Sequence, residues 1–140
     1  MYIWNMLNES KIQAAFHKYM RYAYPDVMAF AIPNGFFAGK NGIAHAVRMK
    51  AEGMMKGVPD YWIVAPSADG KYVGLVIEFK AGSNKPSKEQ KHYLEYLNNN
   101  SFRAVVCYST DEAIYEVERY MDDDSVEPMP EDEYDRFTNE

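Results

Sequence analysis

The sequence predicts an α/β domain with a mixed central β-sheet flanked by helices. Segments with apolar residues at helical spacing alternate with short apolar runs typical of strands, in the order α-β-α-β-β-α-β-α. Two of these runs, 61–65 and 71–80, are joined through the turn sequence SADG, which predicts a β-hairpin within the sheet. A length of 140 residues suits one such domain with a single moderate core.

The first half of the chain holds two of the expected helices and the first strand. Apolar residues recur at helical spacing from about residue 9 to residue 23, and Asn8 is the expected N-cap of this helix. A short strand is expected between the turns of segment 24–35. A second helix follows from residue 43 and is stopped by Gly53, a residue type that often ends helices.

The second half of the chain begins with the hairpin. Its longer strand, 71–80, is apolar on both faces through most of its length, which predicts a central position in the sheet. The third helix is expected to start with a capping box formed by Ser87 and Gln90, and the last helix with one formed by Ser109 and Glu112. A strand over 103–108 lies between these two helices.

Acidic residues are distributed unevenly along the chain. The formal net charge is −6, yet residues 122–140 alone hold nine acidic residues and one Arg, and the other 121 residues hold 12 acidic and 14 basic ones. We therefore divide the chain into a folded domain, 1–121, and an acidic, disordered tail, 122–140. The tail could compete with a polyanion for the mildly basic domain, or it could only solubilise the protein.

Composition also gives expectations about cellular location and about cysteine or histidine metal sites. No segment approaches the ~20 apolar residues of a membrane helix, and no signal peptide is expected. The single cysteine, Cys107, lies in the apolar run RAVVCY and is expected in the core of a protein from a reducing cytoplasm. His17, His45 and His92 show no zinc spacing, and His17 and His92 are expected on helix surfaces.

Three charged residues interrupt the apolar hairpin. Asp60 precedes its first strand, and Glu78 and Lys80 stand at the end of its second. Side chains alternate along a strand, so Glu78 and Lys80 share one face while Phe79 points to the other. If the two strands pair around the turn, Asp60 lies close to Glu78, and two carboxylates and one ammonium group converge.

Two converging carboxylates repel each other unless one is protonated or a cation lies between them. Magnesium fits such a place, because it takes oxygen ligands and commonly binds one or two carboxylates together with substrate phosphates. A bound metal can activate water and polarise a phosphate, and Lys80 could orient that water and offset negative charge. The alternative is structural: a Pro-Asp turn, and a surface ion pair between Glu78 and Lys80.

Further short segments occur around the hairpin in a definite order. They are ESKIQ at 9–13, PNG at 33–35, MKAEGMMKGVPD at 49–60, EFK at 78–80, and KPSKE followed by Gln90. In order and spacing, over about residues 9–121, they resemble the VRR-NUC branch of the PD-(D/E)XK nuclease superfamily. The resemblance implies a restriction-endonuclease-like fold and a metal-dependent DNA endonuclease that uses Mg²⁺, for which Mn²⁺ may substitute.

The resemblance also implies roles for the residues of the hairpin. Asp60 and Glu78 would bind the metal, together with the main-chain carbonyl of Phe79. Lys80 would be the catalytic lysine. All positions of the core pattern are present in this chain.

Two more residues are implied as catalytic, and each has a competing explanation. Glu9 would face the same site and contact the metal or its water, but it could instead complement the dipole of the first helix. Gln90 would lie beside the site, but it could instead only complete the capping box with Ser87.

Basic residues upstream of Asp60 are candidates for contacts with DNA. Lys40 lies in the glycine-rich segment GFFAGKN, which could approach a DNA backbone or form a plain surface loop. Arg48, Lys50 and Lys56 could contact phosphates or only solubilise the second helix.

The sequence therefore predicts a magnesium- or manganese-dependent DNA endonuclease that needs no organic cofactor and no membrane. Short stand-alone members of the family resemble phage-encoded proteins that act as dimers on branched DNA. The resemblance thus implies a homodimer, a branched substrate such as a Holliday junction, and the cytoplasm of a phage-infected bacterium. The alternative is a non-catalytic DNA-binding module that retains the nuclease fold and uses the metal structurally.

Overall fold

The computed structural model describes residues 2–33 and 42–122 of the chain. Its elements follow the expected order: α1 (Tyr2–Ala23), β1 (Met28–Ala31), α2 (Gly42–Ala51), β2 (Tyr61–Val64), β3 (Gly74–Phe79), α3 (Lys88–Asn98), β4 (Phe102–Cys107) and α4 (Thr110–Asp122). The expected α/β fold with a mixed sheet is confirmed. The candidate DNA contact Lys40 and the acidic segment beyond Asp122 lie outside the described residues.

The four strands form one mixed sheet in the order β1-β2-β3-β4. The first two pairings are antiparallel, and β3 pairs with β4 in parallel, so that α3 is the crossover between them. Tyr61 lies opposite Ile77, which confirms the β2–β3 hairpin. All six residues of β3 are buried, as the apolar pattern on both faces indicated.

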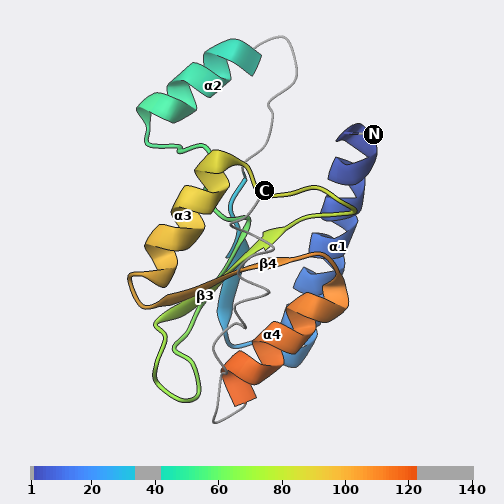
Figure 1. Ribbon diagram of the computed structural model, residues 1–140, viewed down its shortest axis with the longest axis vertical. Helices are drawn as coiled ribbons and strands as arrows, with labels where there is room; N and C mark the ends of the chain where they lie inside the picture. The colour runs from blue at the N-terminus through green and yellow to red at the C-terminus, as the bar shows by residue number, and fades with distance from the viewer. Residues whose placement is uncertain (1, 34–41, 123–140) are drawn as a thin grey trace.

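Helices cover both faces of the sheet (Figure 1). On one face, Phe16 and Met20 of α1 and Val117 and Tyr120 of α4 pack on the side chains of alternate strand residues, including Phe79. On the other face, α3 packs on β3 and β4 through a smaller apolar cluster: Val76, Leu94, Leu97, Ala104 and Val106. Cys107 is buried in the larger cluster, as expected.

Two element boundaries differ from expectation. Helix α1 begins at Tyr2, so Asn8 lies inside the helix and the predicted N-cap is wrong. No Gly or Pro interrupts residues 2–8, and an N-cap residue type permits a helix start without enforcing one. Strand β3 begins at Gly74, because the preceding backbone bonds elsewhere: the Tyr72 N–H donates to Ser67 Oγ.

The expected capping boxes form at α3 and in part at α4. Ser87 and Gln90 make both bonds of the box. At α4, Ser109 Oγ accepts from the Glu112 N–H at 3.0 Å, but the Glu112 carboxylate accepts from the Tyr108 N–H, one residue before the position the box predicts.

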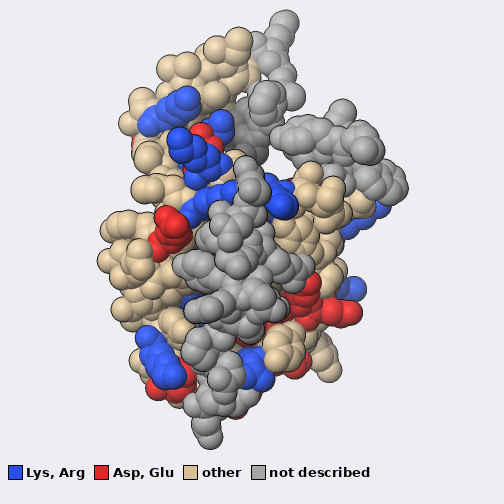
Figure 2. Space-filling model, viewed as in Figure 1, with Lys and Arg blue, Asp and Glu red and all other residues tan. Residues whose placement is uncertain are grey.

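Helix α2 stands apart from the layers and contains no buried residue (Figure 1). Arg48 and Lys50 on this helix, and Lys56 after it, are exposed. Figure 2 shows Lys and Arg side chains around this end of the molecule in the same view. Within the described residues, no helix is long and apolar enough to cross a membrane.

Candidate active site

The hairpin places two carboxylates side by side at the end of β3. Glu78 is 2% exposed, although its neighbours in the strand are apolar. Asp60 stands next to it across the hairpin, where its Oδ2 accepts from the Phe79 N–H at 3.0 Å. The backbone carbonyl of Asp60 also accepts from the Ile32 N–H at 2.8 Å, which ties the turn to the strand edge. A surface ion pair is therefore the wrong description of Glu78 and Lys80.

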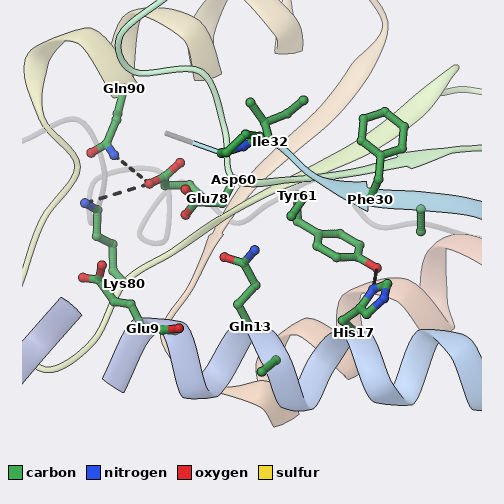
Figure 3. A pocket seen from close by; sticks show the side chains of 15 residues that line it. Glu9, Gln13, His17, Phe30, Ile32, Asp60, Tyr61, Glu78, Lys80 and Gln90 are labelled. Atoms are coloured by element: carbon green, nitrogen blue, oxygen red, sulfur yellow. Dashed lines mark hydrogen bonds and ion pairs between the residues drawn. The ribbon is translucent and has the colours of Figure 1, made fainter. Parts of the chain in front are cut away.

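The two oxygens of the Glu78 carboxylate have different surroundings (Figure 3). Oε1 accepts a hydrogen bond from Gln90 Nε2 at 2.6 Å and lies 3.9 Å from Lys80 Nζ. Oε2 is buried, and no described residue makes a hydrogen bond to it. A buried acceptor without a partner is costly and rare in folded proteins. The site thus holds Glu78 through one oxygen and leaves the other open to a ligand.

The surroundings of the Glu78 carboxyl also shift its pKa. Burial, followed by the negative charge of Asp60, raises the pKa of the Glu78 carboxyl well above its ordinary value. The ammonium group of Lys80 lowers this pKa by less, and the more distant charge of Glu9 raises it further. A cation bound between the carboxylates would offset both the repulsion and the missing partner of Oε2.

The donor set fits a hard divalent cation such as Mg²⁺. Two carboxylates are a usual number for Mg²⁺, which completes its shell with water and substrate oxygens. Among residues 2–33 and 42–122, no group of three or more His, Cys, Asp or Glu side chains converges to form a metal site. Asp60 and Glu78 would therefore be the principal side-chain ligands, and the Phe79 carbonyl stays a prediction.

Glu9 faces the same site from α1. Its Oε1 accepts from Asn84 Nδ2 at 3.3 Å, a contact that connects α1 to the loop after β3. Glu9 does not join Asp60 and Glu78 in a three-carboxylate metal group. Its position in the cleft is consistent with a contact to a metal-bound water, which stays a prediction.

Gln90 has both of the roles that the sequence left open: it completes the capping box and it contacts the site. Its Oε1 accepts from the Ser87 N–H at 2.7 Å, which completes the capping box, while its Nε2 donates to Glu78. The same side chain therefore starts α3 and orients the buried carboxylate. An amide has an acceptor and a donor end, so Gln can make both contacts where Glu could not.

Gly57 brings the turn before Asp60 against the start of α3. Its φ is +91°, and a Cβ there would lie 2.7 Å from Glu89 Cβ and 3.0 Å from the Gln90 backbone nitrogen. Such distances leave no room for a side chain, and the backbone atoms cannot move aside cheaply. The close approach therefore fixes the distance between Gln90 and the turn that carries Asp60.

These residues lie at one end of a cleft of ≈ 930 Å³ between α1 and the strand ends. Along α1, Glu9, Gln13 and His17 line it at four-residue spacing, as Figure 3 shows. From the sequence, Gln13 is expected in no site and His17 on a helix surface. The signal that could have found them is the helical period itself, which sets both residues on the face of Glu9.

Comparison with known proteins now bears on this arrangement. The sequence matches the VRR-NUC domain family over residues 7–111. The chain belongs to the VRR-NUC family. A solved structure described as a VRR_NUC domain protein is 24% identical, with a TM-score of 0.63, and the similarity covers 80% of this chain and 86% of that one. This likeness confirms the fold. No curated protein matches the sequence significantly.

Family membership and fold confirm the predicted resemblance and identify a nuclease-type domain. The matched region of this VRR-NUC domain includes Asp60, Glu78, Lys80 and Gln90, the residues that converge in the cleft. Arg48, Lys50 and Lys56 do not line this cleft. Their contacts with DNA stay predictions.

We expect Glu78→Gln to stabilise the protein without metal. The raised pKa means that folding disfavours the ionised carboxyl, so stability falls as pH rises above the unfolded value of about 4.3. Gln keeps the acceptor for Gln90 and offers Asp60 a donor. The gain should be about 1–2 kcal/mol at pH 8 and vanish near pH 4. Urea unfolding in EDTA measures it, with exposed Glu95→Gln as control; equal gains for both would contradict the explanation.

We expect Gly57→Ala to destabilise the protein more than Gly53→Ala. Both glycines have positive φ, +91° and +107°, so both substitutions strain the backbone, by about 1–2 kcal/mol. Only residue 57 contacts α3, since nothing lies within 4 Å of a Cβ at 53. Overpacking should add about 1–3 kcal/mol for Gly57→Ala. Urea unfolding of the pair tests the contact, and equal losses would refute it.

Proposed function

We propose that this protein is a divalent-metal-dependent DNA endonuclease that hydrolyses phosphodiester bonds. The observation that carries the proposal is the buried Glu78 carboxylate: Gln90 holds one oxygen, and the other, close to Asp60, has no hydrogen-bond partner among the described residues. A purely structural carboxylate would have both oxygens satisfied. Membership in a nuclease-type family supports the same chemistry.

Each side chain of the site has a distinct part in the proposed reaction. Asp60 and Glu78 would hold Mg²⁺ or Mn²⁺, and the bound ion would supply an activated water and a polarised phosphate. The Phe79 N–H orients Asp60, and Gln90 orients Glu78. Lys80 is 13% exposed in its side chain, so its ammonium group reaches the cleft and can offset charge on the phosphate.

We expect Lys80→Ala and Asp60→Asn each to lower the cleavage rate by at least about 100-fold, in the range found for loss of one electrostatic group. Lys80→Ala should retain metal binding, because both carboxylates remain, whereas Asp60→Asn should lose it. Single-turnover cleavage and the Mg²⁺-induced shift in melting temperature measure the two effects. Lys88→Ala, at an exposed lysine outside the cleft, is the control.

The same pair of measurements separates the proposal from its alternative. A non-catalytic DNA-binding module would show no metal-dependent cleavage in the wild-type protein, and Lys80→Ala would change neither binding nor cleavage. Wild-type cleavage that persists after EDTA treatment would refute metal dependence. Full activity of Asp60→Asn would refute the site.

We further propose branched DNA as the substrate and a two-fold homodimer as the active form, with a Holliday-junction resolvase as one form of the activity. This part rests on the family resemblance. A symmetric junction presents two equivalent phosphodiesters, which a two-fold dimer can engage with two matched sites.

The test of this part is Mg²⁺-dependent cleavage of matched duplex, flap, splayed-arm and four-way DNA, with light scattering at micromolar protein. We expect the four-way or flap substrate to be cut about tenfold faster than the duplex, and a mass of twice 16.2 kDa. Equal rates on all four substrates would contradict the substrate class, and a monomeric mass would contradict the dimer.

A further inference from the structure

The cleft continues well beyond the metal-binding end. Glu9 and His17 are eight residues apart on α1, so they lie about 12 Å apart along the helix. Between them Gln13 lines the same wall, and residues from β1 onward, including Phe30 and Ile32, line the other side (Figure 3). The proposed hydrolysis of one phosphodiester uses only the end near Glu78. The far end has room for a neighbouring part of the same strand.

The far end contains a hydrogen bond that fixes the chemistry of His17. Tyr61 is fully buried, and its hydroxyl lies 2.6 Å from His17 Nδ1. A phenol hydroxyl in such a buried position needs an acceptor for its hydrogen. Among the described residues, His17 Nδ1 is the partner that its hydroxyl has.

The direction of this bond determines what His17 offers to a ligand. When Nδ1 accepts from the Tyr61 hydroxyl, a neutral imidazole carries its hydrogen on Nε2. If the ring becomes protonated, Nε2 still carries a hydrogen. In both states, Nε2 is a donor, and the exposed ring of His17 lies on the wall of the cleft. The buried tyrosine thus sets an exposed histidine to donate.

Arg21 adds a positive charge one helical turn beyond His17. It is exposed, and it forms no hydrogen bond or ion pair with any residue in the described part of the chain. The simple explanation, favourable interaction with the C-terminal end of α1, applies equally to any cation in the last turn. The cleft thus has an acidic end, at Asp60 and Glu78, and an end lined by the donors Gln13 and His17, and Arg21 follows one helical turn beyond this second end.

We propose that His17 and Arg21, with Gln13 beside them, form a second phosphate subsite for a non-scissile phosphate of the bound DNA strand. The inference rests on the proposed nuclease function and extends it. A donor whose hydrogen is fixed and an unpaired cation suit a phosphodiester, which accepts hydrogen bonds and carries one negative charge. The subsite would set the register of the strand, so that a particular phosphodiester reaches Glu78.

The test is a scan of single methylphosphonates along a DNA substrate, each of which removes one backbone charge. Binding is measured in Mg²⁺ with the Lys80→Ala protein, so that the DNA is not cut. We expect one or two flanking positions to weaken binding about tenfold, the contribution of one charged hydrogen bond. Adding His17→Ala should weaken binding of unmodified DNA about tenfold. In this double variant, the methylphosphonate at the phosphate that His17 contacts should cause no further loss of affinity, whereas methylphosphonates elsewhere should act as before.

Two further variants distinguish the subsite from general charge and from folding. Arg21→Ala should reduce the slope of log affinity against log salt concentration by about one. It should also reduce the loss of affinity that the methylphosphonate at the His17 position causes. Lys18→Ala removes the same charge from a position about 100° around α1 from His17, whereas Arg21 lies only about 40° from it, so Lys18→Ala should leave the loss of binding at that methylphosphonate unchanged. Tyr61→Phe should weaken binding of DNA in the presence of His17 but not in the His17→Ala protein, because the hydroxyl acts through the imidazole.

The outcomes are distinguishable. If the wild-type protein cleaves DNA in Mg²⁺ but His17→Ala keeps every methylphosphonate penalty, the subsite is wrong and the nuclease stands. If Lys18→Ala and Arg21→Ala change the effects of the methylphosphonates equally, the positive charge of α1 attracts DNA without a defined contact, and the subsite is wrong. If the wild-type protein neither binds nor cleaves DNA, both the subsite and the proposed function fail. Melting temperatures confirm that each variant is folded.

Discussion

The buried carboxylate of Glu78 is the constraint on which this site depends. A carboxylate inside an apolar sheet costs free energy unless each oxygen has a partner. Gln90 provides for one oxygen, and the negative charge of Asp60, after burial itself, raises the pKa of the Glu78 carboxyl. The sheet is stable despite this because the apolar faces of β3 are fully packed. The protein thus carries a strained electrostatic arrangement whose natural relief is a cation.

Several local features hold that arrangement in place. The capping box starts α3 with Gln90 already directed at Glu78. The turn with Gly57 packs on the backbone of the same helix, and the Phe79 N–H holds Asp60. Three elements that are separate in sequence are therefore fixed to one another at backbone level. A site fixed in this way loses little entropy when it binds its ligand, which is the basis of preorganised catalysis.

Much of this could be predicted from the sequence. Helical apolar periodicity and short apolar runs predicted the order of elements, and the expected pairing of the two hairpin strands placed Asp60 close to Glu78. The spacing of Glu78 and Lys80 required a common face, since side chains alternate along a strand. Residue preferences were less reliable at the ends of elements. Asn8 suits an N-cap, yet α1 starts at Tyr2. The preference for a cap residue is weak compared with an uninterrupted helical segment.

The sequence by itself determined the fold class and the acidic core of the site, because both follow from local apolar patterns and from the pairing of two strands that are neighbours in the chain. Only the tertiary structure decided which face of α1 meets the cleft, and hence that His17 joins Glu9 there. Only the structure also decided that Gln90 serves both the helix start and Glu78, and that Tyr61 bonds to His17 across 44 residues. Such contacts depend on how helices dock on the sheet, and packing of that kind leaves no periodic signal in the chain.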